Sequence, residues 1–91
     1  MKLFKYLNRI INERENTMNK FFETIYFEYK DDVYRLALSY THNNYDAEDI
    51  TQRTFIKVYK NINNIQKNNL KQYLLTITAN ECKDLFKIFL V

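Results

Sequence analysis

Apolar side chains recur at spacings of three and four residues along three stretches of the chain, which is the pattern of helices with one buried face. The first stretch runs from about Asn19 to Tyr40, the second starts at Asp46, and the third begins near Leu70. The positions expected to be buried are Phe22, Ile25, Tyr29, Val33, Leu36 or Ala37, and Tyr40; then Ala47, Ile50, Thr54, Phe55, Val58 and Ile62; then Leu70, Leu74, Thr78, Cys82, Leu85 and Phe89. We therefore expect an all-α fold, a small three-helix bundle around one core.

Two polar segments separate these helices. Residues 41–45, THNNY, form a short predicted turn, and residues 61–69, NINNIQKNN, form a predicted loop that Ile62 and Ile65 tether to the core. Asp46 is the predicted N-cap of the second helix, because its carboxylate can accept hydrogen bonds from free backbone N–H groups. Glu48 and Asp49 add negative charge in the first turn, where the helix dipole favours it.

Residues 1–17 differ from the rest of the chain. Apolar and basic side chains alternate there with helical spacing, which predicts a short basic amphipathic helix as an N-terminal extension. Polar residues recur too often for a signal sequence or a membrane span, so we expect a cytoplasmic protein. Met18 lies at the start of the remaining domain, residues 18–91.

The composition excludes several kinds of site. A chain of 91 residues with 46% hydrophobic side chains suffices for one core. The single cysteine, Cys82, and the single histidine, His42, lie too far apart in sequence for a zinc-binding motif, and Cys82 has no partner for an internal disulfide. No nucleophile and base pair or phosphate-binding loop occurs, so we expect no enzyme activity, metal, cofactor or small-molecule substrate.

The net charge of +3 is unevenly distributed. Residues 1–20 hold five basic and two acidic side chains. Residues 21–55 hold three basic and seven acidic side chains, and residues 56–91 hold six basic and two acidic side chains. An acidic middle and a basic last third fit a domain that meets a protein partner with one part and a polyanion with another. The same asymmetry also arises by chance in small helical proteins, so charge alone leaves both interpretations open.

Three stretches together resemble a known family: VYRLALSYT, DAEDITQRTF and LLTITANECKDLF. They are similar to region 2 of the bacterial sigma factors of the extracytoplasmic-function (ECF) group, over residues 21–87. The resemblance implies a sigma region 2 domain that binds core RNA polymerase and recognises the −10 promoter element in transcription initiation. Region 4, which follows region 2 in the family, has no counterpart within this chain.

The second helix matches the element that docks on the clamp helices of the polymerase β′ subunit. The residues expected to bind polymerase are Asp49, Ile50, Gln52, Arg53 and Ile56, with Phe55 as the core anchor behind them. Arg53 departs from the family pattern, which usually has an acidic residue after the glutamine. A reversed charge at a docking face changes affinity or orientation.

The third helix matches the element that binds the melted non-template strand of −10 DNA. The residues expected to bind DNA are Lys67, Asn68, Asn69, Tyr73, Thr76, Asn80, Lys83 and Lys87. Asn80 is the matched polar contact, because an amide can donate to and accept from a base edge at once. An ordinary solvated asparagine is the alternative. Tyr73 replaces the usual tryptophan and fits the core better than a stacking platform.

Two departures reduce the expected phosphate contacts. Thr76 stands where the family commonly has an arginine, and IFLV replaces a basic run at the end of the chain. Three functions remain open: a sigma factor domain; a decoy that binds polymerase or an anti-sigma factor without reading a promoter; and an unrelated helical protein that uses its N-terminal helix at a membrane or partner.

Overall fold

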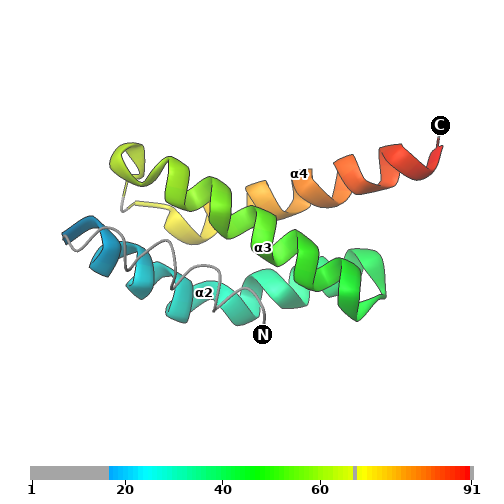
Figure 1. Ribbon diagram of the computed structural model, residues 1–91, viewed down its shortest axis with the longest axis horizontal. Helices are drawn as coiled ribbons and strands as arrows, with labels where there is room; N and C mark the ends of the chain where they lie inside the picture. The colour runs from blue at the N-terminus through cyan, green and yellow to red at the C-terminus, as the bar shows by residue number, and fades with distance from the viewer. Residues whose placement is uncertain (1–16, 67, 91) are drawn as a thin grey trace.

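The computed structural model describes residues 17–66 and 68–90 as three long helices and one short 3-10 helix. These are α2 (Thr17–Thr41), α3 (Asn44–Lys60), η1 (Ile62–Asn64) and α4 (Leu70–Leu90). Successive long helices run in opposite directions, and α4 passes behind α3 with its C-terminal end projecting past the other helices (Figure 1). The prediction of an all-α, three-helix bundle is confirmed. The amphipathic helix predicted at the N-terminus lies outside the described residues, apart from Thr17.

Aromatic rings from α2 and α3 form the larger part of the core. Phe22 and Phe55 are fully buried and meet edge to face, with ring centroids 6.4 Å apart. Tyr26 packs edge to face on Phe55 at 5.0 Å, and Tyr59 packs on Phe22 at 5.2 Å. Each such pair stabilises by about 0.5–1.5 kcal/mol beyond the burial of its area. The remaining members of this aromatic cluster are Ile25, Val33, Val58, Ile62 and Leu74.

A second buried cluster lies near the α2–α3 turn and consists mostly of small residues. Its buried members are Ala37, Ala47, Ile50 and Cys82, from three different helices. Small side chains allow the helix backbones to approach closely there. The six positions predicted for the buried stripe of the second helix are all buried, and so is Cys82 on α4.

The predicted core is wrong in several details. Tyr26 is buried although it was absent from the predicted stripe. Tyr40 is 39% exposed, because the buried stripe of α2 continues from Ala37 towards the half-buried Thr41 instead. Thr51 is fully buried although it was absent from the predicted stripe. Its hydroxyl donates to the Ala47 carbonyl at 2.7 Å, which satisfies its polarity within the helix.

The N-cap prediction for α3 is also wrong by three residues. Asn43, with extended backbone angles, caps the helix, and its Oδ1 accepts the Asp46 N–H at 3.1 Å. Asp46 therefore lies inside the first turn, where its charge still favours the helix dipole. Tyr34 donates its hydroxyl to Asn44 Oδ1 at 3.1 Å, which ties the early start of α3 to α2.

Since the chain has no glycine, other residues adopt the left-handed backbone conformation. His42 has φ 53° just after α2, and its N–H donates to the Leu38 carbonyl at 2.8 Å, closing the end of that helix. Asn69 has φ 60° just before α4. Asparagine tolerates this conformation better than most residues, so the loop into α4 makes its turn without glycine.

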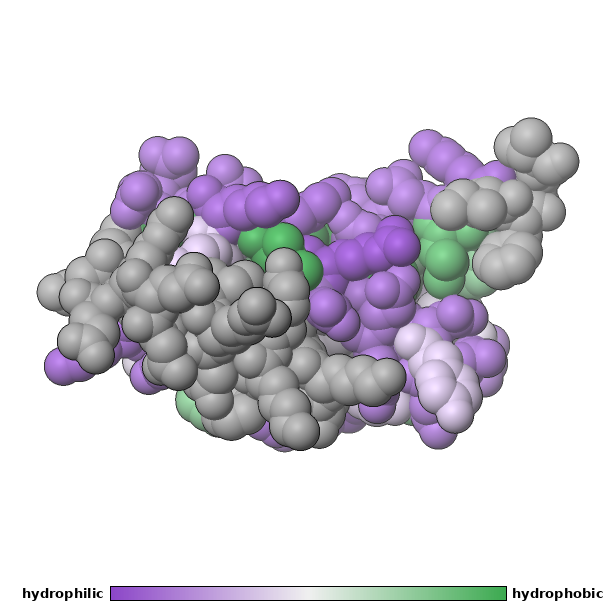
Figure 2. Space-filling view, in the orientation of Figure 1, coloured by the Kyte–Doolittle hydropathy of each residue, from purple (hydrophilic) through white to green (hydrophobic). Residues whose placement is uncertain are grey.

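The surface of the bundle is mainly polar. Figure 2 shows hydrophilic side chains around one small apolar patch over the middle of α3 and another beside the C-terminal part of α4. Exposed large apolar or aromatic side chains in the described ranges include Phe27, Tyr40, Tyr45 and Phe86. Within residues 17–66 and 68–90, no helix combines the length and the hydropathy that crossing a membrane would need.

The capping geometry predicts a difference between two substitutions. Asn43→Ala removes the side-chain acceptor of the cap and should lower the free energy of unfolding by about 1 kcal/mol. Asp46→Ala removes only a favourable charge near the helix start and should cost about 0.3–1 kcal/mol. Urea denaturation of both variants measures the difference. A larger loss for Asp46→Ala than for Asn43→Ala would restore Asp46 as the cap.

Candidate functional site

The outward side of α3 carries most of the residues predicted to bind polymerase. Asp49 and Arg53 are exposed, and Gln52 and Ile56 are half-buried. These four residues, which we call the docking face, lie opposite the buried stripe of α3, because spacings of three and four residues place them on one side of the helix. The sequence-based expectation and the structure agree on where these side chains lie.

Ile50 does not share this placement. Its side chain is fully buried in the cluster with Ala47 and Cys82, so it has no surface to present to a partner. Its carbonyl accepts the Thr54 hydroxyl at 2.9 Å. Ile50 therefore supports the docking face from beneath, and the expectation of a direct contact does not suit the folded chain.

The unusual Arg53 is paired within the docking face. Its Nε lies 3.1 Å from Asp49 Oδ2, one helical turn earlier, and both side chains are about half exposed. A solvent-exposed pair of this kind adds only about 0.3–0.5 kcal/mol to stability. Its larger effect is on charge, because the arginine neutralises the acidic group that would otherwise dominate the face. The docking face is therefore nearly neutral around the half-buried Ile56.

Tyr45 lies beside the docking face, although the sequence-based prediction did not include it among the site residues. It is 85% exposed and lies one turn before Asp49 on the same side of α3. The sequence reasoning assigned it to a turn, because it placed the helix start at Asp46. An aromatic side chain so exposed at the end of a polar face is a typical anchor for a protein partner.

The outward side of α4 carries a second set of predicted residues, in an unbroken helical row. Tyr73, Thr76, Asn80, Lys83 and Lys87 follow one another at spacings of three and four, and we call them the reading row. The row lies on the side of α4 away from the buried stripe of Leu74, Thr78 and Cys82. All members are exposed except Tyr73, which is half-buried and packs against the aromatic cluster.

An open groove of about 570 Å³ lies where the reading row meets the loop before α4. It brings together four of the predicted residues, Asn68, Asn69, Tyr73 and Thr76. Lys67 lies outside the described residues. Asn80, Lys83 and Lys87 continue along α4 beyond the groove lining. The predicted set is therefore divided between a groove and a basic helical extension.

The groove lining is rich in side-chain carboxamides that the sequence reasoning did not single out. Asn61, Asn64, Gln66 and Gln72 join Asn68 and Asn69 around the groove. Each carboxamide has donors and an acceptor, as the edge of a nucleobase does. None of the described lining residues is charged. The described part of the lining thus offers hydrogen bonds to a ligand. The sequence alone does not predict that asparagines distributed over a loop line the same groove.

Burial affects titratable groups away from these two surfaces. Burial raises the pKa of the Cys82 thiol, and the charge of the neighbouring Glu81 raises it further. Burial likewise raises the pKa of the Tyr26 hydroxyl, against a smaller opposing effect of Lys30. In the described part of the chain, His, Cys, Asp and Glu side chains do not gather in threes as a metal site would require.

The raised pKa of Cys82 predicts slow thiol chemistry. At pH 8 the folded chain should hold less thiolate than an exposed cysteine, and burial also blocks access. Alkylation by iodoacetamide should therefore be at least tenfold slower in the native chain than in urea, on the order expected for a buried thiol. Mass spectrometry over time measures both rates. Equal rates would show that Cys82 is accessible and ionised in the folded protein.

The surfaces described above belong to a chain with recognisable relatives. The family model of sigma-70 region 2 matches residues 25–87. The ECF RNA polymerase sigma factor SigE of Mycolicibacterium smegmatis is 40% identical over 60 residues, which are 66% of this chain and 23% of that protein. The ECF RNA polymerase sigma factor SigM of Bacillus subtilis is 36% identical over 58 residues, which are 64% of this chain and 36% of that protein.

The matched region contains all of α3 and most of α4. It therefore includes the docking face and the reading row. The chain spans less than two fifths of the length of either of these relatives. No solved structure matches it. With a family match over more than half of its length and the all-α architecture expected for it, the chain belongs to the sigma-70 region 2 family, with relatives among the ECF sigma factors.

Proposed function

We propose that this chain is a sigma factor domain that binds core RNA polymerase through α3 and the melted non-template strand of the −10 element through α4. It directs transcription initiation by holding its partners and performs no chemical step of its own. The observation that carries the proposal is the placement of the docking face and the reading row on different helices of one bundle. Both partners can then be held at once. Acting with polymerase, the protein would work in the cytoplasm.

The docking face suits a helical partner such as the β′ clamp helices. Ile56 and the stem of Gln52 supply a small apolar centre, and Asp49 and Arg53 supply paired charges beside it. Tyr45 extends this surface by one turn. Since Arg53 and Asp49 neutralise one another, we expect contact area and hydrogen bonds to matter more here than charge attraction.

The reading row and the groove suit two parts of a single strand. The carboxamides of the groove would hold an unstacked base, and Asn80 would contact a neighbouring base edge. Lys83 and Lys87 would meet phosphates further along α4. Lys87 also lies 3.9 Å from Asp84, so its charge is partly offset.

A second candidate function is a decoy that docks on polymerase, or on an anti-sigma factor, without reading a promoter. It is favoured by Thr76, which places an uncharged side chain at the groove where the family commonly has an arginine. The two candidates share the docking face and differ only in strand binding. Separate measurements of the two interactions therefore distinguish them.

The first measurement concerns the docking face. The wild-type chain should bind the isolated β′ clamp helices, and Tyr45→Ala and Gln52→Ala should each weaken that binding by roughly tenfold, as truncation of an anchoring contact does. Isothermal titration calorimetry gives the affinities. Arg35→Ala, an exposed arginine on α2, is the matched control and should bind as wild type does. If the wild-type chain does not bind the clamp helices, the proposal is refuted.

The second measurement concerns the strand. Lys83→Ala should weaken binding to all single-stranded oligonucleotides alike and reduce the slope of log affinity against log salt by about 0.7. Asn80→Ala should leave that slope unchanged and reduce the preference between oligonucleotides that differ at one base. Fluorescence anisotropy titrations at several salt concentrations, with polymerase present, measure both effects.

Lys20→Ala, an exposed lysine on α2, is the control for the strand experiment and should leave the salt slope unchanged. If the wild-type chain binds polymerase but binds all oligonucleotides with equal affinity, the decoy function is supported and promoter recognition is not. If Lys20→Ala changes the slope as much as Lys83→Ala does, the strand is attracted by the overall charge of the chain. The reading row is then not a specific binding surface.

A further inference from the structure

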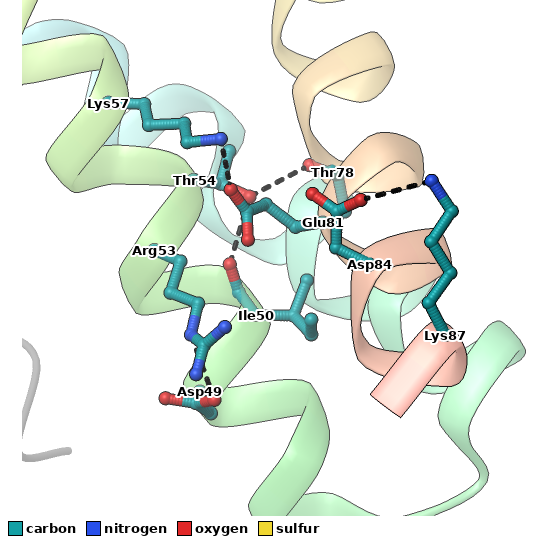
Figure 3. A network of polar contacts seen from close by, with 9 residues as sticks. All are labelled: Asp49, Ile50, Arg53, Thr54, Lys57, Thr78, Glu81, Asp84 and Lys87. Carbon is teal, nitrogen blue, oxygen red and sulfur yellow. Dashed lines mark hydrogen bonds and ion pairs between the residues drawn. The ribbon is translucent and has the colours of Figure 1, made fainter. Parts of the chain in front are cut away.

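The contact between α3 and α4 is polar where it passes between the two hydrophobic clusters. Along α4, Thr78 and Glu81 lie between Leu74 of the aromatic cluster and Cys82 of the second cluster. Thr78 Oγ1 lies 3.3 Å from Thr54 Oγ1 of α3 (Figure 3). Each of these hydroxyls is also within hydrogen-bond distance of the carbonyl one turn earlier in its own helix. We call this polar contact, formed by Thr54, Thr78 and Glu81, the polar seam.

A buried carboxylate completes the seam. The side chain of Glu81 is only 6% exposed, and Lys57 of α3 reaches across to it with its ammonium group. The Lys57 side chain is itself 52% exposed, so the pair lies where the seam reaches the surface (Figure 3). Among the ion pairs of the described residues, Lys57 is the partner of Glu81. A buried carboxylate requires such a partner, because burial disfavours its charge.

The seam restricts the two helices more than apolar contacts would. The aliphatic and small side chains beside the seam, such as Leu74 and Cys82, gain from burial without a preferred direction. A buried carboxylate keeps its partner only while the ammonium group stays within reach, which limits how far α4 can slide or rotate on α3. The Lys57–Glu81 pair therefore restrains how α4 lies against α3.

The two residues also adjoin the two binding surfaces. Lys57 directly follows Ile56 of the docking face, and Glu81 directly follows Asn80 of the reading row. We propose that Lys57 and Glu81 form a positioning pair, which holds the reading row in a fixed orientation relative to the docking face. Through this pair, a chain docked on polymerase by α3 presents Asn80 to the strand at a set angle. The consequence for strand binding rests on the proposed function, but the positioning itself does not.

Four variants separate positioning from simple stability. Lys57→Met leaves the Glu81 carboxylate buried without its partner and should lower the melting temperature. Lys57→Met with Glu81→Met replaces both partners by apolar side chains of similar length, so the melting temperature should return close to that of the wild type. Lys57→Arg keeps the pair. Lys60→Met makes the same change at an exposed lysine of α3 and is the matched control.

The decisive readout is the angle between α3 and α4, measured from residual dipolar couplings of backbone N–H groups in the full chain. In the double variant the couplings of α4 should no longer fit the wild-type orientation, although stability has recovered. Strand affinity should fall by at least about fivefold, as when a binding-competent orientation drops to a fifth of the population. Lys57→Arg and Lys60→Met should keep both the wild-type angle and the wild-type affinity.

Wild-type couplings in the double variant would overturn the inference, since the helices would then hold their angle without the pair. If the double variant fails to fold, Glu81→Met alone serves in its place, because an apolar side chain of similar length leaves only the half-exposed lysine unpaired. A wild-type chain that binds no strand would refute the proposed function, while the dipolar couplings would still decide whether the pair positions α4.

Discussion

The edge-to-face packing of Phe22 against Phe55 is the contact on which the rest of the structure depends. Both rings are fully buried, and Tyr26 and Tyr59 close around them, so α2 and α3 are held in one rotation about their axes. That rotation decides which side of α3 faces outward. It also provides the surface on which Leu74 of α4 packs. Because aromatic rings pack with preferred geometry, this contact fixes orientation as well as supplying burial.

Two chemically different surfaces result from this arrangement. The docking face on α3 is nearly neutral, since Asp49 and Arg53 offset one another, and its apolar centre is small. On α4, a carboxamide-lined groove leads into a basic row that ends at Lys87. Between them, the polar seam with Lys57 and Glu81 joins the helices that bear the two surfaces. A wholly apolar contact between α3 and α4 would restrain the relative orientation of the two helices less.

Much of the fold and part of the site could be predicted from sequence. The periodicity of apolar residues located three helices and most of the buried positions, because burial of one helix face is a local and repetitive pattern. The outward placement of Gln52 and Asn80 followed from the same pattern. Asn43 and Asp46 could not be ranked as caps in this way, since both side chains can accept backbone N–H groups. Tyr45 was assigned to a turn for the same reason.

By itself, the sequence determined helix content, the faces that are buried and the family to which the chain belongs. Only the tertiary structure decided that scattered asparagines such as Asn61 and Asn68 line one groove and that Glu81 is buried against Lys57. Periodicity describes one helix at a time, whereas these properties depend on how far one helix covers another. A buried carboxylate and an exposed one look alike in sequence, and the packing of α3 against α4 makes them different.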